Sequence, residues 1–567
     1  MEKRAILAIV LSLVVVVIWS IFFAPAPSSP PVRAPESPPA TPSAPSTTAP
    51  PAPGPGTAPT TTPSGVVEQT APSSRVASTE VTVDTGVTRI VLTSQGAGVK
   101  RVWLRDFRVS LDPASPHIEM APVPGAKSVP LAAELVLDPR QAPLALGQVA
   151  FVPDSAAART LSANAPESTV TFRSEVKPGL IVHRRYHFFY GSYAFEVETW
   201  LEGIQPQDGS ALLVLWGPGL LEHTEEVKRQ GQTAVQPRSY VSGKVLQEVP
   251  GKDGQPVVHH GTVTWAALGD TYFAAALVPQ QPEANAVVVR RTDGEALTVG
   301  VQTPLQASNQ VQKILVYTGP KHQPTLVQVE PSLDKLIDLG VFSPLARPML
   351  GALRWVHGFV GNYGVSIILV TVLIKLLLWP LTQKSYKSMQ AMQKMQPKLK
   401  ELQVLYKDDR QGLNRAMMQL YRDQKINPMG GCLPMLLQVP FFFAFYNALL
   451  YAIELRHAPF ICWDQPILWG IRGICDLSVY DPSYVTPLLM GVSMFYQQKM
   501  TPTTVADPTQ AKIMQFMPLI FLIFFLNAPA GLVLYWLVNN VLSIVQQVWV
   551  NHTRALEDAK IEAVSKG

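Results

Sequence analysis

One charged side chain lies inside a long apolar stretch of this sequence. The run from Asn362 to Pro380 is long and apolar enough to cross a bilayer, and it contains Lys375. A charged residue within a spanning helix costs roughly 2.5 to 3.5 kcal/mol on insertion scales, so such residues tend to face a hydrated cavity or a partner. Thr371 and Thr382 share a helix face with Lys375. This polar stripe could hold a polar or acidic group within the membrane.

A second interpretation of Lys375 needs no binding site. The lysine lies five residues before Pro380, which ends the predicted span, and its long side chain can extend to nearby lipid headgroups. The helix alone does not decide between the two interpretations. Polar stripes on the other predicted spans favour a shared interior site.

The last apolar segment carries the most regular of these stripes. Its polar residues are spaced by four, three and four positions, from Trp536 to Gln547. A single polar residue in a span usually only joins helices by hydrogen bonds. Stripes on four of the five C-terminal spans instead predict a hydrated groove. Its predicted lining residues are Lys375, Thr371, Gln438, Ser493, Gln497, Trp536, Asn540, Ser543 and Gln547.

Composition and missing motifs exclude several classes of protein. Only 15% of the 567 residues are charged and the mean hydropathy is +0.15, which predicts a membrane protein with a soluble part. The net charge of +5 is spread out and gives no nucleic-acid footprint. The C-terminal spans contain no carboxylate for a proton relay, and no phosphate loop, hydrolase motif or metal-ligand spacing occurs. We predict no enzyme activity, no metal site and no cofactor.

The N-terminal half predicts an anchor, a tether and a β domain. Residues 1–23 begin with basic residues and continue with nineteen uncharged ones, which predicts an uncleaved transmembrane helix with its N-terminus in the cytoplasm. Residues 24–64 contain fifteen prolines and predict an extended linker. Residues 65–330 alternate apolar and polar positions between glycines and prolines, which predicts a large β-sandwich outside the cytoplasm.

In the C-terminal half, predicted membrane spans alternate with predicted segments in water. Residues 384–428 carry ten Lys or Arg against four Asp or Glu, and this excess predicts a cytoplasmic segment. Its helical periodicity predicts an antiparallel hairpin. The other predicted elements are an amphipathic interfacial helix at 331–352, five spans at 353–383, 431–453, 484–498, 512–527 and 530–550, an external loop at 454–483, a cytoplasmic loop at 499–511 and a cytoplasmic tail at 551–567.

Sulfur-containing residues suggest two further features. Methionines recur at helical spacing in the hairpin, where they could form its packing seam or an adaptable surface for apolar segments. These residues are Met389, Met392, Met395 and Met417. Cys462 and Cys475 both lie in the external loop, a compartment that permits disulfides, so we predict that they pair.

Several motifs resemble those of a known family. The sequence contains Gly361-Asn-Tyr-Gly364, Trp379-Pro-Leu-Thr382, Asn427-Pro-Met-Gly-Gly-Cys-Leu-Pro434, Thr501-Pro-Thr-Thr504 and Gly531-Leu-Val-Leu-Tyr-Trp536. Together they resemble the YidC-type membrane protein insertases of Gram-negative bacteria. The resemblance extends to the whole plan: an N-terminal transmembrane helix, a periplasmic β-sandwich of the supersandwich type, and a five-helix C-terminal bundle with a cytoplasmic hairpin.

This resemblance implies a function and a set of partners. Such a protein would insert nascent inner-membrane proteins and help them fold, alone or with the Sec translocon, through a groove open to the cytoplasm and the lipid. It would be a multi-pass monomer with both termini in the cytoplasm, and the ribosome is a further expected partner. Thr371 matches a threonine of the family one turn before the charged residue, and Trp536 stands where the family has a tyrosine or tryptophan that contacts the client. Lys375 stands where arginine is more usual, so it keeps the charge but lacks the two-pronged guanidinium.

Two other functions remain open from the sequence. A solute transporter would show internal repeats with broken helices in matching halves, and no such symmetry is visible across the five predicted spans. A membrane-anchored periplasmic protein that binds glycans would use the β domain for its function and the spans only as an anchor. Removing most of the β domain would distinguish this last possibility from an insertase.

Overall fold

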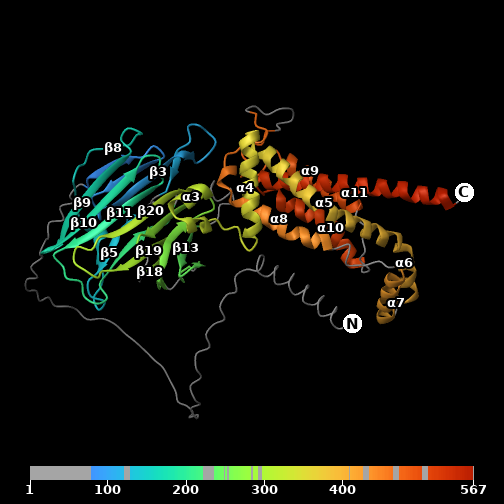
Figure 1. Ribbon diagram of the computed structural model, residues 1–567, viewed down its shortest axis with the longest axis horizontal. Helices are drawn as coiled ribbons and strands as arrows, with labels where there is room; N and C mark the ends of the chain where they lie inside the picture. Colours follow the sequence, from blue (N-terminus) through green and yellow to red (C-terminus); the bar gives the residue numbers. More distant parts are fainter. Residues whose placement is uncertain are drawn as a thin grey trace, which may run out of the picture. The chain divides into compact units, whose positions relative to one another are not determined.

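A β-rich domain precedes a helical part in the chain (Figure 1). The predicted anchor at 1–23 and the linker at 24–64 lie outside the residues that the structure describes. The computed structural model describes residues 78–120, 128–220, 235–247, 249–251, 254–281, 285–291, 296–407, 409–424, 433–463, 472–500 and 508–565.

The strands of the β domain are short to medium in length and follow one another with few helical interruptions. A single turn of 3-10 helix, η1 (Leu146–Gln148), lies among them. The strands are β1 (Glu80–Asp84), β2 (Thr88–Thr93), β3 (Gly98–Arg108), β4 (His117–Glu119), β5 (Ala133–Val136), β6 (Leu144–Ala145), β7 (Val152–Pro153), β8 (Arg159–Thr160), β9 (Glu167–Lys177), β10 (Leu180–Phe189), β11 (Ala194–Glu202), β12 (Ala211–Trp216), β13 (Gln236–Val241), β14 (Lys244–Leu246), β15 (Val257–Gly261), β16 (Val263–Gly269), β17 (Phe273–Pro279), β18 (Asn285–Arg291), β19 (Leu297–Pro304) and β20 (Gln312–Pro320).

These strands form three sheets. The largest has nine strands in the order β14-β13-β16-β17-β20-β11-β10-β9-β7. A six-stranded sheet has the order β15-β18-β19-β12-β5-β6, and a five-stranded sheet has the order β4-β3-β2-β1-β8. The named strand pairs are antiparallel except for β1 with β8. Buried side chains from all three sheets share one apolar core, as expected of a sandwich.

Alternation explains which side chains enter this core. In β10 the even-numbered side chains are buried and the odd-numbered ones are half-buried or exposed, because successive side chains of a strand point to opposite faces. Strand β17 is buried along its whole length. One of its faces contributes Phe273 and Leu277 to the sandwich core, whereas Ala274 and Ala276 on the other face pack in a second core with the following helical segments. The second core joins the nine-stranded sheet to the helical part.

The helical part begins directly after β20. Its elements are α3 (Gln323–Val329), η2 (Pro331–Leu336), α4 (Ser343–Val360), α5 (Tyr363–Lys394), α6 (Gln396–Leu405), α7 (Arg410–Asp423), α8 (Leu433–Tyr451), η4 (Ile453–Leu455), α9 (Val485–Met500), α10 (Pro508–Phe525) and α11 (Ala530–Ser565).

The amphipathic helix predicted at 331–352 has different bounds in the structure. A turn of 3-10 helix ends at Leu336, and α4 starts only at Ser343 and continues to Val360. Pro348 lies inside α4, although proline usually breaks a helix. The buried face of α4 packs in the second core, and this packing outweighs one lost backbone hydrogen bond. Residues 353–360 therefore belong to α4 and not to the first C-terminal span.

That span also ends differently. Helix α5 begins at Tyr363 and runs past the predicted boundary at 383 as far as Lys394. The hairpin predicted at 384–428 therefore consists of the end of α5, then α6 and α7, with a break at Met395. Helix α11 likewise continues beyond 550 to Ser565.

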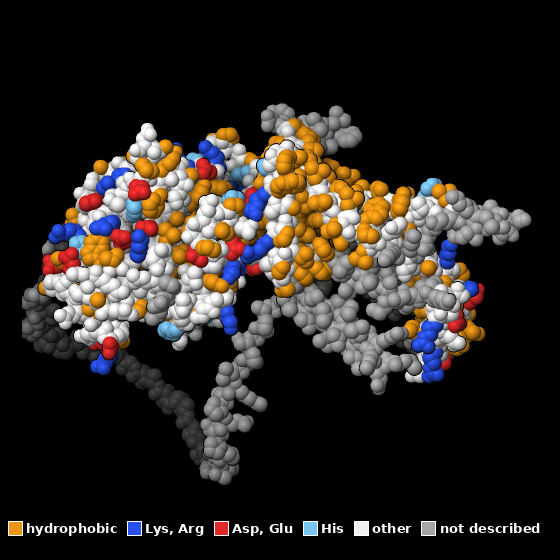
Figure 2. Space-filling model, viewed as in Figure 1, with side chains coloured by type: hydrophobic (Ala, Val, Ile, Leu, Met, Phe, Trp, Pro, Cys, Tyr) orange, Lys and Arg blue, Asp and Glu red, His pale blue; other side chains and the backbone are white. Residues whose placement is uncertain are grey.

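Apolar side chains cover the described face of α4, α5 and their neighbours (Figure 2). Within the described residues, two helical stretches are long and apolar enough to cross a bilayer, Tyr363–Gln383 and Ala530–Thr553. Val439–Tyr451 and Phe516–Phe525 are shorter apolar stretches. Because a helix rises about 1.5 Å per residue, a stretch of about 20 residues is needed to cross the hydrocarbon core of a bilayer.

Candidate functional site

Lys375 lies in the interior of the helical part. Its side chain is 7% exposed, and its Nζ donates a hydrogen bond of 2.7 Å to the Oγ of Ser543 on α11. The ammonium therefore turns towards a neighbouring helix and not along α5 towards its end. No described carboxylate lies within ion-pair distance of Lys375. Of the two interpretations of this lysine, the geometry favours an interior site.

Thr371 lies one turn before Lys375 and is 1% exposed. Its hydroxyl donates to the carbonyl of Ile367 on the same helix at 2.6 Å. This bond to the preceding turn is the usual way in which a helical threonine satisfies its donor inside a membrane protein. Thr371 thus keeps an acceptor oxygen beside the lysine while its hydrogen is used locally.

The polar stripe of α11 divides between two neighbouring helices. Ser543 contacts α5, as described above. Asn540 donates to the Oγ of Ser493 on α9 at 3.3 Å, and Gln547 donates to the carbonyl of Met500 at the end of α9 at 2.8 Å. All three α11 residues are buried. Helix α11 is therefore hydrogen-bonded to α5 on one side and to α9 on the other.

The structure does not place every predicted residue in this polar group. Trp536 packs among aromatic rings, with ring centroids 4.5 Å from Phe442, 5.6 Å from Phe521 and 5.0 Å from Phe525. Gln497 is half-buried on α9. The side chain of Gln438 lies outside what the structure describes.

Two residues that we did not predict join the group. Gln546 is 1% exposed and bonds to α5, and the half-buried Tyr386 lies close to Ser543. Gln546 lies three positions after Ser543, so its helical spacing was a usable signal. Tyr386 lies eleven positions after Lys375, which is three turns along the same face of α5.

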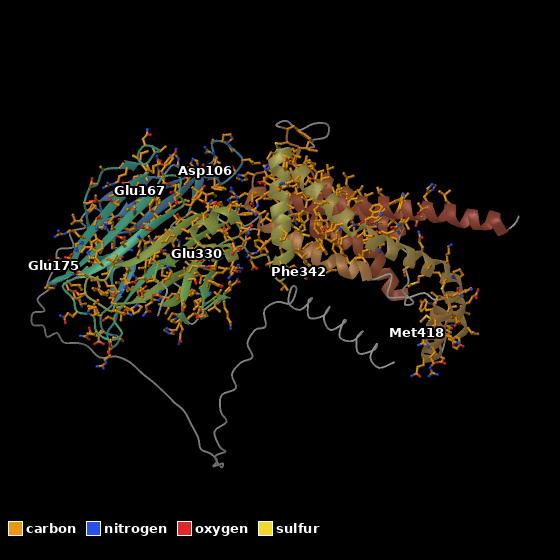
Figure 3. All side chains as sticks on the ribbon, in the orientation of Figure 1. Asp106, Glu167, Glu175, Glu330, Phe342 and Met418 are labelled. Carbon is orange, nitrogen blue, oxygen red and sulfur yellow. A yellow bond between two sulfur atoms is a disulfide. The ribbon has the colours of Figure 1, made fainter. Side chains whose placement is uncertain are left out.

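The hairpin methionines have mixed positions. Met392 and Met395 are buried, which fits the packing-seam interpretation, and Met417 is half-buried. The side chain of Met389 is not among those described. The exposed apolar surface of the hairpin is formed by other residues, among them Met418, which Figure 3 labels, and Val404, which is 79% exposed.

The segment between η4 and α9 contains a disulfide. Cys462 and Cys475 are joined, with Cα atoms 4.6 Å apart. Next to the bridge, the backbone of Phe460 donates to the carbonyl of Ile474 at 3.0 Å. Within the described residues, no group of three or more His, Cys, Asp or Glu side chains could hold a metal ion.

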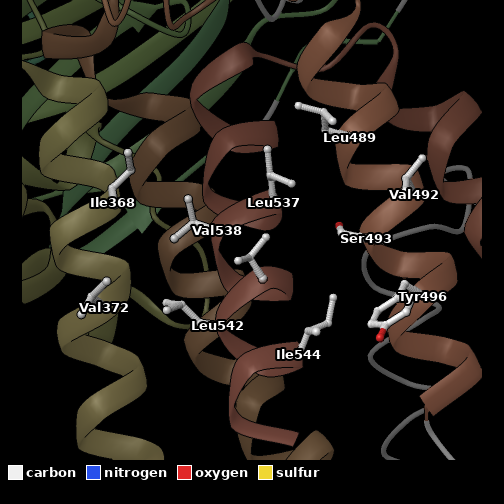
Figure 4. Close-up of a pocket in the computed structure, with 11 residues that line it drawn as sticks. Ile368, Val372, Leu489, Val492, Ser493, Tyr496, Leu537, Val538, Leu542 and Ile544 are labelled. Atoms are coloured by element: carbon white, nitrogen blue, oxygen red, sulfur yellow. The ribbon is translucent and has the colours of Figure 1, made fainter. Parts of the chain in front are cut away.

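An apolar cleft of about 630 Å³ lies across α5, α11 and α9 (Figure 4). Ile368 and Val372 line it from α5, and Leu489 and Val492 line it from α9. Ser493 lies at this cleft and also accepts the hydrogen bond from Asn540, so the cleft borders the polar group. Its other lining residues are Tyr496, Leu537, Val538, Val541, Leu542 and Ile544.

Comparisons with known proteins cover nearly the whole chain. The family models "YidC periplasmic domain" and "60Kd inner membrane protein" match residues 80–352 and 355–557. A membrane protein insertase YidC of Syntrophus aciditrophicus (strain SB) is 37% identical over 97% of this chain and 99% of its own length. One of Citrifermentans bemidjiense is 36% identical over the same shares. A crystal structure of an active YidC insertase is 17% identical, covers 82% of this chain and 92% of that chain, and has a TM-score of 0.34.

A large β domain joined to apolar helices that enclose a lysine defines a membrane protein with a substantial part outside the bilayer. The relatives named above refine this class. The chain belongs to the YidC family of membrane protein insertases. It acts on nascent membrane proteins at the inner membrane, carries a periplasmic domain, and is not an enzyme.

Proposed function

We propose that Lys375 and Ser543 form the polar site that holds the tail of a client during insertion. The observation that supports this role is the incomplete hydrogen bonding of a buried ammonium. An ammonium has three donors, and among the described residues only Ser543 accepts from that of Lys375. A carboxylate or carbonyl of a client can accept the remaining donors and replace part of the water that its tail loses.

The proposed groove is lined from several helices around this pair. Thr371 on α5, Ser493 and Gln497 on α9, and Asn540 and Gln547 on α11 contribute hydroxyl and amide groups. Gln438 of α8 and Trp536 of α11 complete the set, the latter through its aromatic cluster. A groove that reaches partway through the bilayer shortens the hydrocarbon path that a charged tail must cross.

The proposed topology has six spans. The segment 1–23 anchors the chain with its N-terminus in the cytoplasm, and α5, α8, α9, α10 and α11 form the C-terminal bundle. Helix α4 lies at the outer surface of the membrane, where its exposed Trp355 and Phe359 suit an interfacial position. The hairpin of α6 and α7 and the end of α11 lie in the cytoplasm.

Hydrophobic transfer can supply the work of insertion. A client first contacts the exposed apolar residues of the hairpin, such as Val404, Leu405 and Met418. Its tail then enters the site at Lys375, and its apolar segment leaves sideways into lipid. Burial of apolar surface releases about 25 cal/mol per Å². A monomer suffices for these steps, and the Sec translocon and the ribosome are further proposed partners.

The test compares clients that differ only in the charge of their tails. The full-length protein in proteoliposomes receives single-span clients with acidic or uncharged extracellular tails, and insertion is measured as protease protection. Lys375→Met is expected to slow the acidic clients about tenfold, and the uncharged clients much less, because only the acidic tail loses a charge partner. Equal slowing of both clients would contradict the proposed role of the charge.

Leu376→Met is the matched control for this experiment. It introduces the same side chain at the next position of α5, where the leucine is 59% exposed on the outer face. Photocrosslinkers at Thr371 and Trp536 provide an independent test. Both should crosslink ribosome-bound nascent chains of clients, and the absence of crosslinks at Thr371 would contradict client entry beside the lysine.

A further inference from the structure

Gln546 joins α11 to α5 through two hydrogen bonds. Its side-chain amide donates to the hydroxyl of Thr382 at 2.7 Å and to the backbone carbonyl of Trp379 at 3.3 Å. The residue is 1% exposed, so these bonds form away from water. Its Oε1 is buried and has no hydrogen-bond partner among the described residues. A buried amide with an unused acceptor is costly, so the contact of Gln546 with α5 calls for a reason.

The two acceptors lie on either side of a weak point in α5. Pro380 lies inside this helix and lacks a backbone N–H, so the carbonyl of Leu376 loses its helical hydrogen bond. Thr382 bonds back to Leu378 and Trp379 at 3.1 Å each, a pattern that often bends a helix. The helix is therefore weakened where Gln546 contacts it.

Other contacts attach both halves of α5 to the same partner. Ser543 accepts from Lys375, which precedes the proline, and lies close to Tyr386, which follows it. Further along, Gln390 of α5 donates to Asn551 of α11. Helix α11 contains no proline between Ala530 and Ser565, so it is the stiffer of the two helices.

The cytoplasmic half of α5 leads into the hairpin. It continues from Pro380 to Lys394, and α6 follows after the break at Met395. The angle of α5 at the proline therefore sets where the hairpin lies relative to Lys375. A contact that spans the proline controls this angle.

We infer that Gln546 is a positioning residue that braces α5 across Pro380 and so keeps the hairpin aligned with the lysine site. We call Gln546, Thr382 and the carbonyl of Trp379 the α5 brace. The inference rests on the proposed function, because it assumes that clients pass from the hairpin to Lys375. The brace acts on the transfer between these two sites and not on the capture of the client.

The test measures capture and transfer separately in the full-length protein. Capture is read as photocrosslinking of a client to a probe at Met418 on α7, and transfer is read as the rate of protease protection in proteoliposomes. Gln546→Leu removes both bonds of the brace. We expect about five- to tenfold slower transfer, as for the loss of a buried hydrogen bond, with unchanged capture.

A double-mutant cycle tests whether Gln546 acts through Thr382. Thr382→Val removes the acceptor and retains the shape of the side chain. If the brace is the cause, Gln546→Leu combined with Thr382→Val transfers clients no more slowly than Gln546→Leu alone. Val545→Leu is the matched control, because it introduces the same side chain at the preceding position of α11, where Val545 is 55% exposed.

Three results would overturn the inference: unchanged transfer in Gln546→Leu, an equal loss of capture and transfer, or additive effects in the double mutant. If Gln546→Leu does not fold, as judged by its melting in detergent, Thr382→Val alone is the test. Slower transfer in this variant supports the brace, and an unchanged rate of transfer contradicts it. Gln546→Leu should slow acidic and uncharged clients equally, because the brace carries no charge. Lys375→Met is expected to slow the acidic clients more than the uncharged ones. A failure of the charge role and a failure of the brace therefore give different results.

Discussion

The β domain and the helical part each bury a cation that has no acidic partner among the described residues, but they hold it differently. In the β domain, Arg184 is fully buried, and its Nη1 donates to three backbone carbonyls, those of Gly96, Ala97 and Leu131, at 2.7 to 3.2 Å. Ala97 and Leu131 have positive φ angles of 45° and 62°, which turn these carbonyls inward. The acceptors of Arg184 thus belong to the backbone of the fold.

Within the described part of the chain, Lys375 donates to one acceptor, the hydroxyl of Ser543, and this hydroxyl belongs to a side chain on another helix. A backbone acceptor cannot leave without unfolding its loop, whereas a serine can rotate away. Burial of a cation therefore does not by itself indicate a binding site. A binding site is indicated when a client group can take the place of the acceptor that holds the cation.

The largest expected effect is on the stability of the β domain. Arg184→Met removes the donor of the inward carbonyls of Gly96 and Leu131, whereas the carbonyl of Ala97 still accepts from the hydroxyl of Tyr186. We expect a loss of about 3 kcal/mol in the free energy of unfolding. Urea denaturation of the full chain in detergent measures it. The control is Arg185→Met, because the neighbouring arginine is 47% exposed and its ion pair with Glu198 is worth little. Equal stability of the two variants would show that Arg184 is not a structural cation.

A third buried cation gives a prediction for pH. Lys321 is 5% exposed and donates to the carbonyl of Asp270 at 2.7 Å. Burial, helped by Arg238 and opposed by the carboxylates of Asp270 and Asp338, lowers the pKa of Lys321 from its usual 10.5 to about 8. Between these two pH values the folded protein has released a proton that the unfolded chain still binds.

The free energy of unfolding should therefore rise between pH 8 and pH 10.5, by roughly 2 kcal/mol relative to Lys321→Met. Denaturation curves of both proteins across this range measure the difference. If the free energy of unfolding changes with pH in the same way for both proteins, the pKa of Lys321 is the same in the folded and the unfolded chain. Such a result would leave Arg184 as the only clear structural cation in the comparison.

A smaller effect on stability is expected at Lys375. Lys375→Met loses one hydrogen bond but also removes the cost of burying a charge, so the free energy of unfolding should change by less than about 1 kcal/mol. The same urea assay applies. A loss as large as that of Arg184→Met would remove the distinction between the two cations and make Lys375 structural as well.

The smallest effect is expected at the partner of the lysine. Ser543→Ala removes the acceptor but leaves the ammonium, and clients with acidic tails should insert about two- to threefold more slowly because the lysine is less well positioned. The rate of protease protection is the measurement. Ser543→Thr retains the hydroxyl and is expected to insert at the original rate. Identical rates for the alanine and threonine variants would exclude a role for the hydroxyl.

Local patterns in the sequence were sufficient for much of the fold. Strand alternation predicted the β domain, and the apolar runs predicted the helical part with a charge at Lys375. They did not predict that α4 would continue through Pro348 to Val360, since its packing in the second core compensates for the proline. The interior position of Arg184 could have been found, because it alternates with the buried Val182 and Tyr186 in β10.

Contacts between helices were harder to predict. Trp536 lies on the predicted polar stripe of α11, yet it packs against phenylalanines of α8 and α10. Gln546 lies at helical spacing from Ser543, but that spacing did not show that it would contact Thr382 of α5. Helical spacing states which residues share a face, but it does not state which neighbouring helix that face meets.

Residue type and local spacing were enough to predict that a positive charge would lie in an apolar helix and that Cys462 and Cys475 would lie in one loop. Only the tertiary structure decided that Lys375 turns to Ser543 and that Gln546 spans Pro380. The physical reason is that these contacts join residues more than 160 positions apart, and the crossing of whole helices sets their distance.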